Sequence, residues 1–342
     1  MTLPTPLTLM GAPGSPYTRK MLAVLRYRHI PYRLLLSNSP QLASLPQAKV
    51  PLLPTFYLPG PDGDVVAATD STPLIRRFEE EFSGRSVIPS HPALAFLNDL
   101  IEDYADEWLT KAMFHYRWYY ADDIAKGAKI LPCWRGFSIP DDVLAERGKF
   151  ISERQISRLR YVGSHAATAP VIESSYVRFL QAMEDHLRLY PYLLGTRPSA
   201  ADFAVYGQLT QLAEFDPTPM ALTLKVAQRV TAWVGMLEDQ SGVDPEEDGW
   251  FSVDALPPTL LAILTEIGRV YPPVMLANAK AVMNKESEVA AEVDGAPWQQ
   301  QPFPYQAKCL GWLRDSRIAL SGAERDKVDA ILAGTGCEAM FQ

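Results

Sequence analysis

The pattern of apolar and polar positions predicts a small α/β unit at the start of the chain. The apolar run Leu7–Met10 predicts a strand, because glycine and proline follow it directly. From Pro16 onward apolar residues recur at helical spacing, and the run 32–36 predicts a second strand. Two further apolar runs flank Asp62-Gly63, a pair typical of tight turns, and therefore predict a hairpin.

A helix is predicted directly after this hairpin, in the stretch "TDSTPLIRRFEEEF". Asp70, Ser71 or Thr72 can cap it, and Pro73 suits the first turn, where a missing N–H costs nothing. The apolar positions of this stretch fall on one helical face. The predicted order is therefore β-α-β followed by β-β-α.

After about residue 92 the strand signals almost vanish and long amphipathic helices are predicted. They are expected at 93–120, 174–189, within 197–215, at 221–237 and in further segments after residue 257. The segments 121–170 and 238–258 are expected to be long loops or insertions. A chain of 342 residues exceeds one typical core, so more than one domain is expected. The expected division is an α/β domain (1–83), a linker (84–92) and an all-helical domain (93–342), of which 238–342 is an extension.

The composition of the chain argues against nucleic-acid, membrane and metal partners. A formal net charge of −8 argues against a nucleic-acid partner, which would require clustered Lys and Arg. No run approaches the roughly 20 apolar residues of a membrane span, so no membrane partner is expected. The three cysteines are far apart and the five histidines show no metal-ligand spacing, so no metal site is expected. A reduced, cytoplasmic protein is the expectation.

The stretch "GSPYTR" at 14–19 raises the question of chemistry. Ser15 can cap the following helix with its hydroxyl. A helix N-terminus also stabilises an anion, and it lowers the pKa of a thiol placed beside it. A serine hydroxyl aimed at the same point can donate a hydrogen bond to the thiolate. Ser15 can therefore act as a cap only, or as a cap that also stabilises a reactive sulfur.

Three stretches resemble the glutathione transferases. "GSPYTRKMLAVLRYRHIPYRLL" resembles the family's opening, in which a Ser, Cys or Tyr near the start of the first helix contacts the glutathione sulfur. "LLPTFYLPGPDGDVVAATDSTPLIRRFEEEF" resembles its cis-proline, hairpin and acidic-Ser block, and "YLLGTRPSAADFAVYGQL" resembles its second-domain signature. The resemblance covers residues 7 to about 237. It implies a thioredoxin-like N-terminal domain followed by an all-α C-terminal domain, with glutathione as co-substrate.

The resemblance also implies where the glutathione thiol lies. Ser15 takes the position of the sulfur-contacting hydroxyl. Leu53 precedes Pro54, which is expected to be cis, and the backbone of Leu53 is implied to pair with the cysteinyl part of glutathione. Val50-Pro51 competes for the cis position, but "PTFYL" fits the strand that the Asp62-Gly63 turn closes.

The two ends of glutathione are implied to bind elsewhere in the first domain. Asp70 and Ser71 match the acidic-Ser pair that binds the γ-glutamyl amine and carboxylate at a helix N-terminus. Lys49 is a weaker candidate for the glycyl carboxylate. Each has a plain alternative, because Asp70 and Ser71 are good caps and Lys49 can be a solvated charge.

The helix at 93–120 is a candidate wall of a second-substrate pocket. Tyr104, Trp108, Lys111 and His115 fall on one face, at i, i+4, i+7 and i+11. An aromatic surface there suits an apolar electrophile. The alternative is that this face packs in the core, and no carboxylate partner can be assigned to His115 from the sequence.

These observations lead to one main hypothesis and two alternatives. The main hypothesis is a homodimeric glutathione transferase that conjugates a small hydrophobic electrophile. The first alternative is a transferase-fold binding or assembly module without turnover, which the long extension favours. The second is a thiol-disulfide enzyme that uses Cys133, Cys309 or Cys337, although Thr18 stands where glutaredoxin-like relatives have their second cysteine.

Overall fold

Four strands in the order β2-β1-β3-β4 form one sheet in the computed structural model, which describes residues 3–342. They are β1 (Leu7–Met10), β2 (Tyr32–Leu35), β3 (Thr55–Pro59) and β4 (Val65–Ala68). β1 is parallel to β2, and β3 is antiparallel to β1 and to β4. The crossover is α1 (Pro16–Tyr27), and α2 (Ser71–Glu81) follows β4. The predicted thioredoxin-like order is confirmed.

Apolar side chains hold the two helices against this sheet. Leu9 and Phe56 lie opposite each other on β1 and β3, and both are fully buried. Phe78 of α2 packs edge-on against Phe56, with ring centroids 5.4 Å apart.

At the hairpin turn Gly63 has φ 85°, a left-handed conformation that glycine adopts without strain.

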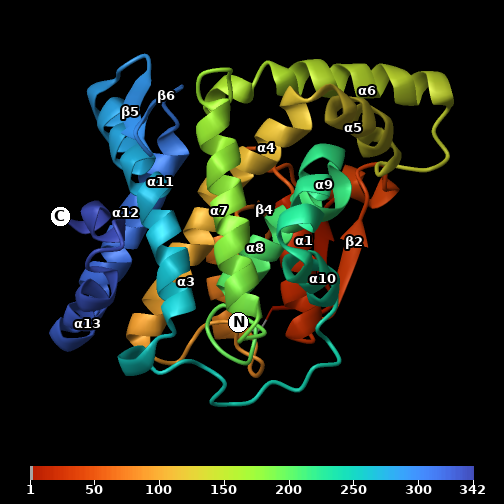
Figure 1. Cartoon of the computed structure of the whole chain (residues 1–342). Helices are drawn as coiled ribbons and strands as arrows, with labels where there is room; N and C mark the ends of the chain where they lie inside the picture. Colours follow the sequence, from red (N-terminus) through yellow and green to blue (C-terminus); the bar gives the residue numbers. More distant parts are fainter. Residues whose placement is uncertain (1–2) are drawn as a thin grey trace.

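Helices form most of the remaining chain (Figure 1). They are α3 (Pro92–Tyr104), α4 (Thr110–Tyr119), α5 (Ala121–Cys133), α6 (Asp141–Ile156), α7 (Ala169–Leu187), α8 (Ala200–Leu209), α9 (Pro217–Val226), α10 (Gln228–Leu237), α11 (Pro258–Asn284), α12 (Pro304–Ala319) and α13 (Gly322–Leu332). A π-helical turn, Ala105–Leu109, joins α3 to α4, so the predicted helix 93–120 continues through a local change of period.

α8 is the central helix of this part, and all of its residues are buried. Ser199 and Asp202 form a capping box at its start, because the side chain of each accepts a hydrogen bond from the backbone N–H of the other. Gly207 lets α8 approach α1 closely, since a Cβ atom there would lie 2.6 Å from the carbonyl oxygen of Pro16.

The segment 121–170 differs from the expectation of a loop, because it contains α5 and α6. These helices pack closely, and a Cβ atom at Gly148 would lie 2.2 Å from the carbonyl oxygen of Ala128. Asp141 and Asp142 at the start of α6 and Arg154 at its end complement the helix dipole. The buried residues of α6 are Gly148 and Ser152, so no apolar period marks this helix in the sequence.

The C-terminal extension also differs from the all-helical expectation, because it contains a hairpin of β5 (Val289–Val293) and β6 (Ala296–Gln300). Asp294 and Gly295 form its turn with φ values of 53° and 73°. This is the same Asp-Gly signal that predicts the first hairpin. The strands around it are rich in Ala, Glu and Gln, which are weak strand formers.

α11 is the one helix in the described part of the chain that is long and apolar enough, by length and composition, to cross a membrane. Here it packs against α7, α12 and β5. Glu266 of α11 forms an ion pair with Arg178 of α7 at 2.7 Å. Most of its apolar side chains, including Ile267 and Tyr271, are buried in the protein core.

Candidate functional site

The N-terminus of α1 meets the loop that precedes β3. Ser15 Oγ accepts a hydrogen bond from the backbone N–H of Thr18 at 3.2 Å and donates one to the carbonyl of Leu53 at 3.0 Å. The Leu53–Pro54 peptide bond is cis, as expected, in preference to Val50–Pro51. Ser15 is partly exposed.

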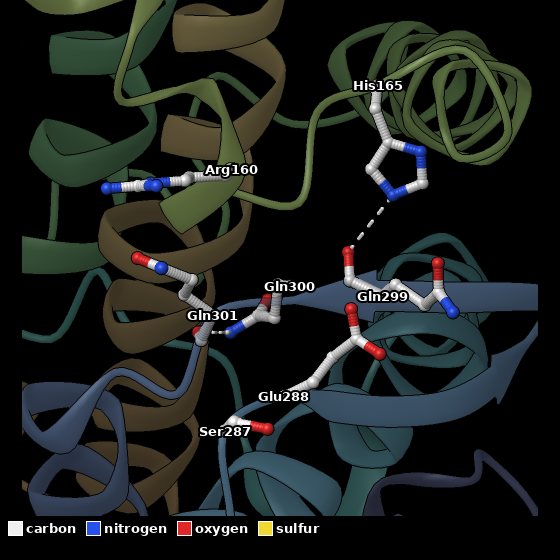
Figure 2. A pocket seen from close by; sticks show the side chains of 7 residues that line it. All are labelled: Arg160, His165, Ser287, Glu288, Gln299, Gln300 and Gln301. Carbon is white, nitrogen blue, oxygen red and sulfur yellow. Dashed lines mark hydrogen bonds between the residues drawn. The ribbon is translucent and has the colours of Figure 1, made fainter.

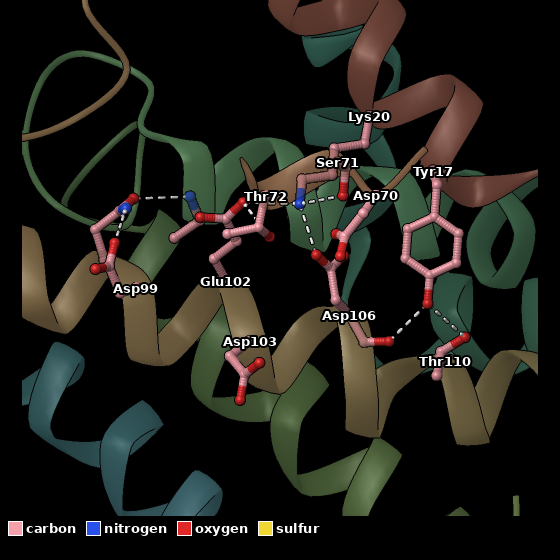
Figure 3. A network of polar contacts seen from close by, with 12 residues as sticks. Tyr17, Lys20, Asp70, Ser71, Thr72, Asp99, Glu102, Asp103, Asp106 and Thr110 are labelled. Carbon is pink, nitrogen blue, oxygen red and sulfur yellow. Dashed lines mark hydrogen bonds and ion pairs between the residues drawn. The ribbon is translucent and has the colours of Figure 1, made fainter. Parts of the chain in front are cut away.

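Asp70 and Ser71 lie at the N-terminus of α2, and both side chains contact other protein groups. Asp70 has φ 82° and its carboxylate makes no capping bond. It accepts a hydrogen bond from the hydroxyl of Tyr305 in α12 at 2.6 Å. Ser71 is buried and accepts one from Lys20 Nζ at 3.0 Å (Figure 3). Lys49, the third candidate, is exposed in the loop before the cis bond.

Lys20 is a buried cation between the two domains. Its ammonium lies 2.8 Å from Glu102 of α3 and 2.6 Å from Asp106 in the π-helical turn (Figure 3). Glu102 also pairs with Arg76 of α2 at 2.8 Å. Burial alone raises the pKa of Glu102, but Lys20 and Arg76 outweigh it and hold this pKa down at about 2. The network therefore ties α1 and α2 to α3 with ionised groups.

A second buried cation, Arg117 of α4, fixes the loop before Ser15. It donates to Asp216 at 2.9 Å, to Gln211 at 2.6 Å and to the carbonyl of Gly14 at 3.0 Å. The C-terminal domain thus positions the turn that leads into α1.

The four residues expected to line a second-substrate pocket are buried. Trp108 packs on Trp298 of β6 at 5.2 Å between ring centroids, and Lys111 donates to Gln300 of β6 at 3.0 Å. Tyr104 packs edge-on against Tyr271 of α11. The extension therefore packs against Tyr104, Trp108 and Lys111, and none of the four residues lines either of the cavities described below.

The fourth of these residues, His115, has the carboxylate partner that the sequence does not identify. Its Nε2 lies 3.1 Å from Glu173 and its Nδ1 lies 2.7 Å from Ser164 Oγ. Burial lowers the pKa of His115, and Glu173 opposes this shift. Because His115 and Ser164 are both buried, this Ser-His-Glu chain has a structural role.

The cysteines offer little support for thiol chemistry. All three are free, and Cys309 and Cys337 are buried. Burial raises the pKa of Cys337 to about 12 and that of Cys309 further, which disfavours the reactive thiolate. Within residues 3–342 no group of three His, Cys, Asp or Glu side chains is arranged to hold a metal ion.

Two cavities lie beside the extension. The larger, about 350 Å³, opens between the loop at 160–165 and the β5–β6 hairpin, where His165 contacts the carbonyl of Gln299 (Figure 2). The smaller, about 90 Å³, lies between α2, α3, the π-helical turn and α12. Ser15 lines neither cavity.

Sequence reasoning misses two residues that contact the candidate site, Lys20 and Tyr305. Lys20 carries a signal, because it lies next to Met21 on the apolar face of α1 and so requires a buried partner. Its partners Glu102 and Asp106 can also be suspected from the sequence, because they belong to the acidic stretch "EDYADE" within an otherwise apolar helix. Nothing in the local sequence predicts the role of Tyr305, because its partner Asp70 is 235 positions away.

Comparison with known families gives two matches. The model described as "Glutathione S-transferase, N-terminal domain" matches residues 9–86, and "Glutathione S-transferase, C-terminal domain" matches residues 153–235. A search of curated protein sequences finds no match.

The similar solved structures are distant in sequence. A glutathione transferase family member from Pseudomonas fluorescens with two glutathione bound is 14% identical, with 67% of this chain and 87% of that chain covered and a TM-score of 0.42. A glutathione transferase from Burkholderia graminis with two glutathione molecules bound per subunit is 16% identical (75% and 87% covered, TM-score 0.40). FzlA from C. crescentus is 16% identical (69% and 88% covered, TM-score 0.41).

Proposed function

Because the chain belongs to the glutathione S-transferase superfamily, we propose that it binds glutathione at the amino end of α1 and holds its thiol as the thiolate. The observation that carries this proposal is the contact between Ser15 Oγ and the carbonyl of Leu53, 3.0 Å apart. On binding, the cysteinyl backbone pairs with Leu53, and the Ser15 hydroxyl turns from that carbonyl to the sulfur. The helix N-terminus adds its partial positive charge.

The γ-glutamyl end of glutathione then reaches Asp70 and Ser71 at the N-terminus of α2. Asp70 accepts the amine once Tyr305 releases it, and the carboxylate lies near Ser71 and the ammonium of Lys20. Lys49 is exposed in the loop that precedes the cis bond, and we assign it to the glycyl carboxylate.

The proposed second substrate, compartment and oligomeric state are those expected from the family. The thiolate attacks a small apolar electrophile, and the chain works in the cytoplasm as a homodimer. Since Tyr104, Trp108, Lys111 and His115 are all buried, the electrophile approaches the sulfur from another direction.

Ser15→Ala is expected to lower the rate of glutathione conjugation to an aryl halide about 10- to 100-fold, the cost of one hydrogen bond to a charged group. The variant also loses a helix cap, worth about 1 kcal/mol. Steady-state kinetics measure the loss of kcat/KM, and an absorbance titration of the bound thiolate measures the change in its pKa.

Ser321→Ala is the matched control, because Ser321 caps α13 through the backbone N–H of Glu324 and lies outside the site. It is expected to lose similar stability and retain full activity. A Ser15→Ala enzyme with unchanged kcat/KM and thiolate pKa would remove Ser15 from the mechanism.

Tyr305→Phe is expected to tighten glutathione binding about 3- to 10-fold, because it removes the hydroxyl that occupies Asp70. Calorimetric titration measures the affinity. Tyr161→Phe, at an exposed tyrosine in the loop before α7, is the control and should leave the affinity unchanged. Equal affinity in wild type and Tyr305→Phe would show that Asp70 does not bind the ligand.

A further inference from the structure

The small cavity beside α12 combines acidic and aromatic side chains. Its volume of about 90 Å³ is lined by Asp103, Asp106 and Glu107 on one side and by Tyr305 and Trp312 of α12 on the other. A cavity of this size has room for more than a single water molecule. It can therefore hold a small ligand.

The cations around the cavity form ion pairs with only some of its carboxylates. Lys20 and Arg76 pair with Glu102 and with one further carboxylate each. Asp103 is half-buried and Glu107 is buried, and neither takes part in an ion pair within residues 3–342. Burial raises the pKa of both carboxyls, and a cation bound beside them would stabilise their ionised forms.

Asp106 supplies a second, independent sign of a ligand. The residue is 7% exposed, and its Oδ2 accepts from Lys20. Its Oδ1 is buried and has no hydrogen-bond partner in the part of the chain that the structure describes. A buried, unpartnered acceptor that lines a cavity needs a donor from its occupant.

The lining identifies the chemistry of this occupant. Within residues 3–342 no carboxylate group is arranged to hold a metal ion, which argues against a bare cation. An ammonium group brings several N–H donors to separate acceptors, and the rings of Tyr305 and Trp312 favour a cation beside them. We propose that this cavity binds the ammonium group of a small organic amine. The cavity lies apart from the proposed thiol position, because neither Ser15 nor Leu53 lines it, but it shares Tyr305 with the proposed γ-glutamyl site.

The test uses the full chain and methylammonium as the probe. Calorimetric titration at constant ionic strength is expected to show saturable binding, with an increase in melting temperature. Potassium and tetramethylammonium ions, which lack N–H donors, are expected to show neither effect. Absence of saturable methylammonium binding, or an equal effect of potassium, would overturn the proposal.

Glu107→Gln keeps the shape of the cavity but removes a carboxylate that can accept from the ammonium, so methylammonium should bind about tenfold more weakly. Asp315→Asn, at an exposed position of the same helix α12, is the control with unchanged affinity. If Glu107→Gln does not fold, Trp312→Leu replaces it, with binding expected to weaken about threefold. Wild-type affinity in whichever of the two is measured would refute the site.

Discussion

Replacing Lys20 with methionine is expected to lower the free energy of unfolding by about 3–5 kcal/mol. The side chain is 1% exposed, and its ammonium is held by Glu102 at 2.8 Å and Asp106 at 2.6 Å. Methionine is similarly long and apolar, so packing is largely preserved while Asp106 loses its cation and Glu102 keeps only Arg76. Urea denaturation at neutral pH measures the loss.

The pH dependence separates this effect from a packing defect. In the wild type the pKa of Glu102 is held at about 2, below its unfolded value, so this stabilisation is present above the unfolded pKa and fades as the pH falls. Burial raises the pKa of Asp106 to about 6 even beside Lys20, and loss of Lys20 raises it further, so at about pH 5 Asp106 is protonated and no longer needs the cation. The deficit should therefore be larger at about pH 8 than at about pH 5. A deficit that is independent of pH would contradict the electrostatic account.

Lys149→Met is the matched control. Lys149 is 77% exposed on α6 and lies 3.9 Å from Glu153. Exposed pairs of this kind contribute little, so the change should alter stability by less than about 0.5 kcal/mol.

Trp298→Ala is expected to lower the free energy of unfolding by about 3–5 kcal/mol. Trp298 is fully buried on β6, packs on Trp108 at 5.2 Å and lies against Gly163, where a Cβ atom would approach the indole to 2.4 Å. Alanine leaves a cavity at the junction of the extension with the helical core. Chemical denaturation measures the loss, and limited proteolysis should show faster cleavage near the β5–β6 turn.

Trp312→Ala is the matched control for this prediction. Trp312 lies on α12 and is 48% exposed, so its removal should cost about 1 kcal/mol or less. Equal losses in the two variants would mean that the hairpin does not contribute a core residue.

The N-terminal fold is predictable because its signals are local. The run Leu7–Met10, the cap at Ser15 and the Asp62-Gly63 turn each determine a feature within a few residues. The same is true of the capping box of α8. Where local signals are weak the prediction fails: α6 buries little apolar surface, and in β5 and β6 Ala, Glu and Pro dilute the strand-forming Val and Trp.

The candidate site is predictable in part for the same reason. The cis bond at Leu53–Pro54 is implied by the resemblance to the family, whereas local signals predict Asp70 and Ser71 at a helix start. Their present partners, Tyr305 and Lys20, are not predicted. Those contacts join elements that are distant in the chain and are brought together by packing.

The helix at 93–120 illustrates the division most clearly. The sequence alone predicts that Tyr104, Trp108, Lys111 and His115 share one face, because helical period is a local property. Whether that face borders a pocket or the core was decided only by the tertiary structure, in which Gln300, 189 positions after Lys111, packs against it. Burial and ion pairing depend on which distant surfaces meet, and the local pattern of a chain does not contain that information.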